Sequence, residues 1–323
     1  MTNDDIAQFM DTSDEWIRTR TGIRQRRFAA AHETTDSMAI EAANRALDRA
    51  RIVPSAVDLI IVATLTPDYF FPSTASLVQD AIGASQAGAF DLSAACSGFI
   101  YGLSMASAAL MSGSAKVAIV IGAETLSRIL DDQDRSTYPL FGDGAGAVVL
   151  RAHQIPGGVL GGKLGSDGSG GDHLIIPAGG SKLPTSQDTV DNRMHFVKMN
   201  GREVYRFATR IMGRVAKEAC DQAGVGVNEI DLFIPHQANI RIIQSATKFL
   251  GISEEKVFTN LDKYGNTSAA SVPIALCEAI EQGWVKTHDK IVMVGFGAGL
   301  TWGAAVIQWG VVRPYKRRQW WYR

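Results

Sequence analysis

Short apolar runs alternate with longer amphipathic stretches along this chain of 323 residues. The segment AVDLIIVATLTPD predicts a buried strand over Leu59–Ala63, because a continuous apolar run is typical of a strand covered on both faces. The segment EIDLFIPHQANI predicts a matching strand around 232–234. These two strands give the first sign that the chain repeats itself.

The rest of the pattern continues the repeat. After the first strand comes GAFDLSAACSGFIYGLSMASAALMSGSAKVAIVIGAET, and after the second come KVFTNLDKYGNTSAASVPIALCEAIEQG and DKIVMVGFGAG. Both read as a strand, a sharp turn, a helix and another strand, and each half then ends in a glycine-rich segment, at 141–150 and 296–307. Strands that alternate with helices indicate mostly parallel sheets wrapped by helices. The sequence therefore predicts an α/β fold of two similar halves packed together.

The boundaries of these halves follow from the glycine-rich stretch 157–171, which is the candidate crossing point between them. We expect a first half over 1–157, a second half over 158–310 and a tail over 311–323. If the halves match, the first should open with a strand like GGVLGGKLGSD, but the chain opens with a helical pattern capped by Asn3 or Asp4. We therefore expect the first N-terminal strand to be missing. The basic and aromatic tail RPYKRRQWWYR is expected to be a disordered extension.

Composition excludes several classes of protein. With 46% hydrophobic and 20% charged residues the chain has ample material for a large core, and a net charge of -1 gives no sign of a nucleic-acid or membrane partner. No apolar run approaches the roughly 20 residues of a membrane span, and the start lacks the features of a signal peptide. We expect a cytoplasmic protein.

Cysteine and histidine usage argues against a metal. The three cysteines, Cys96, Cys220 and Cys277, are too few and too scattered for a disulfide framework or a Cys-x-x-Cys site. The six histidines form no His-Glu-x-x-His or His-x-His pair. We expect no metal site.

One cysteine stands at a chemically active position. Cys96 lies in DLSAACSGF, between a short strand and a helix that begins near Ser97. A thiol at a helix N-terminus faces free backbone N–H groups and the positive end of the helix dipole, both of which stabilise the thiolate. The residues alone leave open a buried structural cysteine, the reading that fits Cys220 and Cys277 better.

Two polar residues occupy related positions in the second half. His236 in IPHQAN follows an apolar strand, where catalytic groups of parallel sheets collect. Asn266 in YGNTSAAS lies at the strand-to-helix turn that Cys96 occupies in the first half. Either residue alone could be a loop or capping residue. Together, at matching turns of packed halves, they predict one shared cleft.

Several blocks of sequence carry a family resemblance. DTSDEWIRTRTGIRQR, AACSGF, FGDGAGAVVL, PHQANIRII, GNTSAASVPIAL and GFGAGLTWG resemble the β-ketoacyl-acyl carrier protein synthase III family, in order over about 2–309. The resemblance implies a thiolase-like fold in a layered α-β-α-β-α arrangement, a homodimer, and initiation of fatty-acid synthesis. It also implies acyl-CoA and malonyl-acyl carrier protein as substrates, and no cofactor.

The resemblance assigns roles to individual residues. Cys96 resembles the nucleophile that takes an acyl group, and His236 and Asn266 resemble the pair that drives decarboxylation of malonyl-carrier protein. Phe296 resembles the aromatic residue beside the nucleophile. The backbone N–H of Cys96 and one from the last glycine-rich loop would hold the oxyanion, and in that loop Ala298 stands at a family glycine position. These roles agree with acyl transfer to sulfur followed by stabilisation of an enolate by neutral donors.

Binding residues follow in the same way. Trp16 and Arg135 resemble the pair that sandwiches the adenine of CoA, an arrangement that a planar guanidinium favours. Arg20 resembles a contact on the phosphate side. Phe71 in FFPST resembles the aromatic residue that shapes the acyl pocket, with a reach across the dimer interface.

A basic stripe points to an acidic partner without help from the family. Arginines recur every four residues in GREVYRFATRIMGRVAKEA, which places them on one helix face. The expected contacts with carrier protein are Arg206, Arg210, Arg214, Arg241 and Lys248, while Arg202 stands where the family often has a small polar residue. The alternative is a solvated face paired with Glu203 and Glu218.

Rival interpretations remain. The order Cys, His, Asn also fits a papain-like protease, but the CGxCW-type signature is absent. A biosynthetic thiolase would need a second cysteine in GFGAGLTWG, which has none. A non-elongating acyltransferase, a condensing enzyme of a specialised pathway and an inactive truncated homologue stay open. The preferred starter acyl group is not predicted, because chains that differ by a few methylenes differ little in pocket burial.

Overall fold

The first of two four-stranded sheets contains the strands that flank the predicted nucleophile. The computed structural model describes residues 1–154 and 157–310. The sheet has the order β2-β1-β3-β4; β1 is parallel to both neighbours and β4 is antiparallel to β3. Its members are β1 (Leu59–Ala63), β2 (Gly88–Leu92), β3 (Val117–Glu124) and β4 (Gly144–Arg151).

The second sheet repeats this arrangement. It has the order β5-β10-β9-β8, with β8 parallel to β9 and β10 antiparallel to both β9 and β5. Its members are β5 (Gly158–Ser166), β8 (Leu232–Pro235), β9 (Lys290–Gly297) and β10 (Thr301–Gln308). The strand over Leu59–Ala63 was predicted at its observed bounds, and the predicted strand at 232–234 is confirmed as β8.

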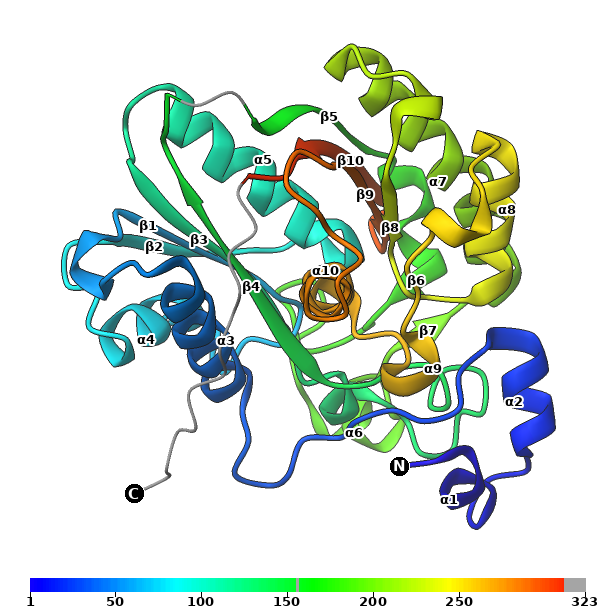
Figure 1. The fold of residues 1–323 in the computed structure, drawn as a ribbon. Helices are drawn as coiled ribbons and strands as arrows, with labels where there is room; N and C mark the ends of the chain where they lie inside the picture. Colours follow the sequence, from blue (N-terminus) through cyan, green and yellow to red (C-terminus); the bar gives the residue numbers. More distant parts are fainter. Residues whose placement is uncertain (155–156, 311–323) are drawn as a thin grey trace.

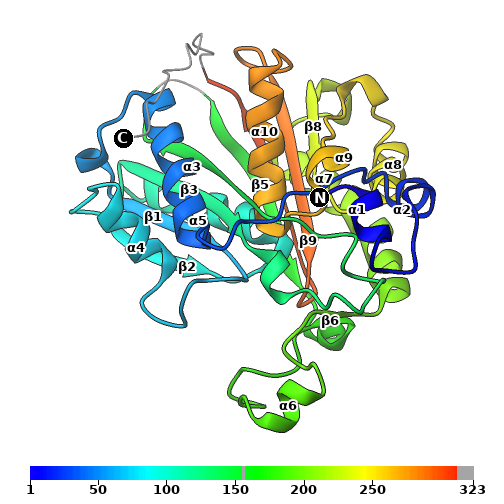
Figure 2. The ribbon, with the colours of Figure 1, turned by 90° about the horizontal axis from the view of Figure 1, so that it is seen from below.

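Helices complete five layers, α-β-α-β-α (Figure 1). Two helices, α5 (Gly98–Met111) and α10 (Ser271–Glu281), lie between the sheets. The outer face of the first sheet is covered by α3 (Thr35–Ala50) and α4 (Thr74–Ala81), and that of the second by α7 (Gly201–Ala223) and α8 (Ile240–Leu250). Figure 2 shows the same layers from below, with α10 between the two sheets.

Apolar side chains fill the spaces between these layers. One cluster lies under α7 and α8, one between the sheets around α5 and α10, and one under α3 and α4. On α7, Phe207, Ile211 and Val215 recur every four residues and are buried, so one stripe of this helix faces the second sheet. The core therefore supports the ends of the central strands, where the candidate residues lie.

Smaller elements surround the layers. The N-terminal helices α1 (Asn3–Ala7) and α2 (Asp14–Thr21) lie on the second-half side, where α2 contacts α8. Thr2 caps α1 with Asp5 in a capping box, so the expected cap at Asn3 or Asp4 is wrong by one residue or more. The remaining elements are β6 (Leu174–Ile175), β7 (Lys198–Met199), α6 (Gln187–Asp191) and α9 (Leu261–Tyr264). The 3-10 turns are η1 (Pro54–Ala56), η2 (Ala95–Ser97), η3 (Leu126–Ile129), η4 (Gly168–His173), η5 (Val227–Glu229), η6 (Glu254–Lys256) and η7 (Ser268–Ala270).

The two sheets differ at both edges, because among the described residues no strand beside β8 matches β2 and no strand beside β4 matches β5. In the second sheet β5 pairs with β10, whereas within residues 1–154 and 157–310 no strand pairs with the matching edge of β4. The glycine-rich stretch 157–171 forms β5 and η4. The basic and aromatic tail 311–323 lies outside the described residues. None of the described helices combines the length and the apolar composition that crossing a membrane requires.

Candidate active site

Cys96 lies in the turn η2, directly before α5, and is buried at 5% exposure. Ala95 starts this turn at φ 48°, a left-handed conformation that is uncommon for a non-glycine residue. Two glycines of β9 pack against the turn: a Cβ atom at Gly295 would lie 2.9 Å from the Cys96 carbonyl oxygen, and one at Gly297 would lie 2.6 Å from the Cys96 nitrogen. Only glycine allows this close approach of the two halves.

The protonation of Cys96 differs from the expectation of a stabilised thiolate. Burial raises the pKa of the Cys96 thiol to about 12, and the Ser268 side chain opposes that rise. Desolvation disfavours the charged form of a buried group. The thiol is therefore protonated at neutral pH, and the helix N-terminus does not outweigh burial.

His236 follows β8 and is also buried, at 1% exposure. Its Nδ1 lies 2.6 Å from Ser271 Oγ at the start of α10, and its Nε2 has no hydrogen-bond partner among the described residues. Burial lowers the pKa of His236 to about 3. The ring is therefore neutral, with one nitrogen held and the other free for a substrate.

Asn266 lies just before the turn η7 and is 7% exposed. Its Oδ1 accepts a hydrogen bond of 2.8 Å from the backbone N–H of Ser268. Its backbone is fixed in turn, since its N–H donates to Leu140 and its carbonyl accepts from Gly142. With Oδ1 occupied in this way, the amide presents Nδ2 as its remaining donor.

A cavity of about 210 Å³ brings these three side chains together. Cys96, His236 and Asn266 all line it, which confirms that the two halves place them in one cleft. Phe296 also lines it, with its ring 5.3 Å from the His236 ring in an edge arrangement. The other lining residues were not predicted from the sequence; they are Leu140, Phe141, Leu174, Met199, Gly201, Val204, Tyr205, Ala238, Asn239, Ile242 and Gly297.

Ala298 is not part of this lining. It follows β9, its carbonyl accepts from the Thr301 hydroxyl at 3.0 Å, and the neighbouring Gly297 lines the cavity instead. Its backbone role in an oxyanion hole stays a prediction.

Trp16, Arg20 and Arg135 lie together on the surface near α2. The Arg20 guanidinium carbon is 4.5 Å from the centre of the Trp16 ring, and that of Arg135 is 4.9 Å away. Arg135 also pairs with Asp11 at 3.1 Å. The expected pair is confirmed as neighbours, but Arg135 stands directly on the ring, at less than the roughly 7 Å that a stacked base between two planar groups would need.

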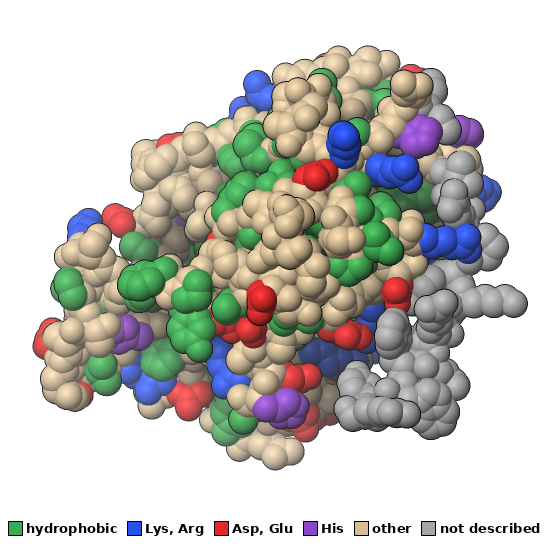
Figure 3. Space-filling view, turned by 90° about the vertical axis from the view of Figure 1, so that its left-hand side faces the viewer, with side chains coloured by type: hydrophobic (Ala, Val, Ile, Leu, Met, Phe, Trp, Pro, Cys, Tyr) green, Lys and Arg blue, Asp and Glu red, His purple; other side chains and the backbone are tan. Residues whose placement is uncertain are grey.

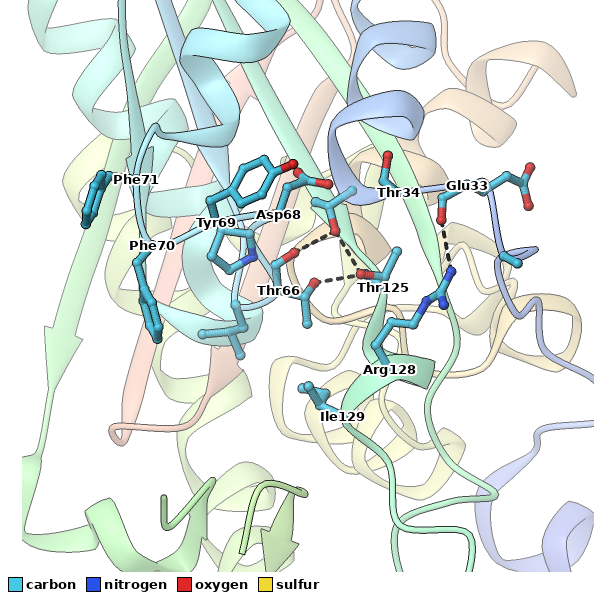
Figure 4. Close-up of a pocket in the computed structure, with 14 residues that line it drawn as sticks. Glu33, Thr34, Thr66, Asp68, Tyr69, Phe70, Phe71, Thr125, Arg128 and Ile129 are labelled. Carbon is cyan, nitrogen blue, oxygen red and sulfur yellow. Dashed lines mark hydrogen bonds between the residues drawn. The ribbon is translucent and has the colours of Figure 1, made fainter. Parts of the chain in front are cut away.

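Phe71 lies outside the cavity of Cys96. It is 86% exposed and belongs to the Tyr69–Phe70–Phe71 loop on the rim of a separate hollow of about 750 Å³ (Figure 4). Thr66 and Thr125 are hydrogen-bonded at the base of this hollow. Within one chain, therefore, Phe71 does not shape the space beside the nucleophile.

The basic residues lie on two packed helices, as expected. Arg206, Arg210 and Arg214 are exposed on α7, and Arg241 and Lys248 are exposed on α8. Part of the alternative interpretation also holds, because Arg206 pairs with Glu203 at 3.3 Å and Arg214 with Glu218 at 3.6 Å. Arg241 donates to the Thr19 carbonyl at 2.9 Å.

Three polar residues beside the site were missed from the sequence. Ser271 holds His236, and Ser268 and Glu124 lie next to the nucleophile turn. Short polar residues at a turn give no signal of what they touch across the molecule. Within the described ranges, no three His, Cys, Asp or Glu side chains gather as a metal site.

Comparison with known proteins points to one family. A family model described as 3-oxoacyl-[acyl-carrier-protein] synthase III matches residues 90–168, and one for the C-terminal part of the same enzyme matches 220–309. The chain is 53% identical over 310 residues to a β-ketoacyl-[acyl-carrier-protein] synthase III of Symbiobacterium thermophilum, covering 96% of this chain and 94% of that one. It is 51% identical to one of Clostridioides difficile, over 94% of this chain and 92% of that one.

Solved structures show the same fold. The 3-oxoacyl-[acyl-carrier-protein] synthase III of Aquifex aeolicus matches with a TM-score of 0.89 and 49% identity, over 96% of this chain and 95% of that one. A priming β-ketosynthase from the R1128 polyketide pathway matches with the same TM-score and 36% identity, over 97% of this chain and 93% of that one. The five layers are thus those of the thiolase-like fold, and the chain belongs to the 3-oxoacyl-[acyl-carrier-protein] synthase III family.

Proposed function

We propose that Cys96 accepts an acyl group from an acyl-CoA, and that His236 and Asn266 then drive its condensation with malonyl-acyl carrier protein. Membership of the family makes the reaction class acyl transfer. The single observation that carries the residue roles is the cavity shared by these three side chains, contributed by equivalent ends of the two halves.

The first step exchanges one thioester for another. The Cys96 sulfur attacks the acyl carbonyl carbon, the bond to the CoA sulfur breaks, and the Cys96 proton leaves on the CoA thiol. The backbone N–H of Cys96 lies beside Gly297, which carries no side chain to cover it. This N–H supports stabilisation of the tetrahedral oxyanion.

The second step needs donors without a net charge. When malonyl-carrier protein loses CO₂, the electrons of the broken C–C bond form an enolate, and its charge rests on the thioester oxygen. Asn266 Nδ2–H is one donor, and His236 Nε2–H is the other when Nδ1 is the unprotonated nitrogen. Ser271 Oγ favours that tautomer: it accepts from the Gln237 N–H at 3.4 Å, which leaves its own hydrogen for Nδ1. The enolate carbon then attacks the Cys96 thioester, the C–S bond breaks, and the sulfur leaves as a thiolate that takes a proton from water.

The remaining surfaces suit the proposed substrates. Trp16 with Arg20 and Arg135 would hold the adenine and phosphates of CoA once Arg135 moves off the ring. The exposed basic side chains of α7 and α8 would meet the acidic carrier protein near the cavity mouth.

We also propose a homodimer. The outer edge of β2 pairs with no strand of the described residues, and Phe90 on that strand is 42% exposed. Figure 3 shows hydrophobic side chains over a broad part of this side of the molecule. The exposed Phe70 and Phe71 extend the apolar surface, and a second copy would cover it.

The experiment is intact-protein mass spectrometry after mixing with a panel of acyl-CoAs, followed by addition of malonyl-carrier protein. We expect an acyl adduct that disappears as a ketoacyl-carrier product forms, and no adduct on Cys96→Ala. The acyl-CoA that gives the fastest adduct names the starter. An adduct that persists with malonyl-carrier protein would instead mean a non-elongating acyltransferase, and no adduct from a folded protein would overturn the proposal.

A further inference from the structure

The nucleophile turn has a near copy in the other half. The turns η2 (Ala95–Ser97) and η7 (Ser268–Ala270) contact each other and lead into the central helices α5 and α10. Their first residues share a left-handed backbone, with φ 48° at Ala95 and 47° at Ser268. Cys96 therefore corresponds to Ala269.

The strands beside these turns correspond as well. A Cβ atom at Gly122 of β3 would lie 2.2 Å from the Ala269 carbonyl oxygen, just as Gly295 of β9 packs on the Cys96 carbonyl. Two residues further along, β9 has Gly297, whereas β3 has Glu124. The Glu124 carboxyl interacts with the Ala269 N–H. It therefore occupies the place that stays open beside the N–H of Cys96.

Glu124 is a fully buried acid at 0% exposure, and hydrogen-bond donors rather than a basic side chain face its carboxyl among the described residues. Its Oε2 accepts from the Leu65 N–H at 2.9 Å, the Thr66 hydroxyl at 2.8 Å and the Thr64 hydroxyl at 3.2 Å. Its Oε1 has no well-formed hydrogen bond to a described residue, and neither has Ser268 Oγ. Two unsatisfied buried oxygens on neighbouring side chains call for an explanation.

Ser268 connects this acid to the nucleophile. Its hydroxyl is close enough to the Glu124 carboxyl and to the Cys96 thiol to lower the pKa of both, although neither contact is a well-formed hydrogen bond. Burial raises the pKa of Glu124, which favours the neutral acid. An ionised Glu124 would oppose negative charge on the Cys96 sulfur, and a neutral one does not.

We propose that Glu124 is a positioning residue that acts through Ser268: Glu124 Oε1–H donates to Ser268 Oγ, and the Ser268 hydroxyl donates to the Cys96 sulfur. This arrangement satisfies both orphaned oxygens and aims a donor at the sulfur when it becomes negative. It rests on the proposed function only in that Cys96 is the reacting group. The acid stays protonated throughout and exchanges no proton with the substrate.

The same acid ties the nucleophile to the loop that carries Phe71. The Thr66 hydroxyl, which donates to Glu124, accepts from the Thr125 N–H at 2.8 Å at the base of the hollow in Figure 4. Thr35 completes this group, since its hydroxyl donates to the Thr66 carbonyl at 2.6 Å. Glu124 therefore positions the turn against the segment 64–66.

The first test measures how fast iodoacetamide alkylates Cys96 as a function of pH, followed on the Cys96 peptide by mass spectrometry. Loss of a hydrogen bond to a charged sulfur is expected to slow alkylation of Ser268→Ala about tenfold at each pH, with a matching loss in the acylation rate. Ser268→Gly is the matched variant, because it also removes the hydroxyl but relieves the left-handed backbone. Equal slowing in both variants supports the proposal.

The second test replaces the acid. Glu124→Gln keeps a neutral donor of similar shape and is expected to alkylate within about threefold of the parent rate. Glu124→Met removes the donor at similar volume and is expected to match Ser268→Ala. In the Ser268→Ala background, Glu124→Met should slow alkylation no further, which a merely structural loss would not predict.

Three results would overturn the proposal. Unchanged alkylation in both Ser268 variants would show that the hydroxyl does not act on the Cys96 sulfur. Slowing in Ser268→Gly alone would show that the change in the backbone, and not the loss of the hydroxyl, slows alkylation. Glu124→Gln as slow as Glu124→Met would show that a neutral donor at this position does not support the sulfur. Alkylation does not need malonyl-carrier protein, so loss of condensation with normal alkylation contradicts the proposed function and leaves this inference standing.

Discussion

The turns η2 and η7 have almost the same backbone conformation but different surroundings. A cavity lies beside η2, and a buried carboxyl group lies beside η7. Each begins with a left-handed residue, and each lies against a glycine on a central strand of the other half. Around Cys96, Gly297 leaves space, and a cavity of about 210 Å³ opens there. Around Ala269, Glu124 occupies the matching place. The fold thus supplies two equivalent sites, and side-chain size decides which one admits a substrate.

Burial also has the same effect in the two regions, because it disfavours the charged form of a titratable side chain in each. His236 beside η2 is a base whose pKa burial lowers to about 3, and Glu124 beside η7 is an acid whose pKa burial raises. Burial therefore favours the neutral form of each side chain, because no charged partner among the described residues offsets the desolvation. A site of neutral donors suits an enolate that gains its charge only during the reaction.

The largest effect is expected from replacing Asn266, the proposed donor to the enolate beside η7. Asn266→Ala should lower condensation with malonyl-carrier protein by about 10²–10³-fold, since it removes a donor to the enolate. Acylation by acyl-CoA should stay within a few-fold. The matched control is Ser93→Ala at the equivalent, exposed position before η2, where we expect little change in either rate. Equal loss of acylation and condensation in Asn266→Ala would contradict this division of roles.

The packing of the two turns is tested by matched glycine substitutions. Gly122→Ala places a Cβ atom 2.2 Å from the Ala269 carbonyl oxygen, and Gly295→Ala places one 2.9 Å from that of Cys96. We expect losses in the free energy of unfolding of about 3 and about 2 kcal/mol, because backbone atoms must move apart. Gly168→Ala, with open space around it, is the control. Urea denaturation measures all three, and a neutral Gly122→Ala would refute the close approach.

His236 and Glu124 are expected to change the free energy of unfolding in opposite directions as the pH changes. The unfolded state of His236 takes up a proton below pH 6.5, whereas the folded state does so only near pH 3, so its stabilising contribution falls as the pH falls. Between pH 7.5 and pH 5 this amounts to about 2 kcal/mol. His236→Gln should remove that loss from urea unfolding curves. An unchanged slope of stability against pH in this variant would mean that the ring is charged or hydrated.

Glu124 has the opposite sign. Its folded pKa lies above the unfolded value of 4.5, so its contribution is fully present below pH 4.5 and is lost as the pH rises through the folded pKa. Glu124→Gln should therefore lose less stability than the parent on going from pH 5 to pH 9. A parent and variant with parallel stability curves over this range would show that Glu124 is not titrating.

The repeat could be predicted from the sequence, and most of the site with it. The apolar runs located β1 and β8, and the repeat predicted that Cys96, His236 and Asn266 share a cleft. Asn266 lies at the matching turn, as expected, but at a position three residues earlier in it, because Asn266 corresponds to Ser93 and Cys96 to Ala269. Apolar periodicity fixes the order of elements but not the register of a turn.

The parts that could not be predicted depend on contacts between distant segments. The thiol of Cys96 was expected to be stabilised as a thiolate, but the way η7 and β9 close over it raises its pKa. Glu124 reads from the sequence as the polar end of a strand, and only the pairing of β3 with η7 makes it a buried acid. Phe71 faces solvent in one chain, so the role that the family resemblance implies for it would need a second copy.

The smallest effect is expected at Ala298, which follows Gly297 where the family resemblance implies glycine. A backbone N–H needs no particular side chain, and Ala298 lies outside the cavity lining, so its methyl group has no substrate to contact. Ala298→Gly should change kcat for condensation less than about threefold and the free energy of unfolding by about 1 kcal/mol or less, through the added freedom of the unfolded chain. Steady-state kinetics and urea denaturation measure both quantities. A tenfold change in kcat with unchanged stability would mean that the alanine sets the loop conformation behind Cys96. The shape of the cavity beside Cys96 would then depend on this loop as well as on the glycines of β9.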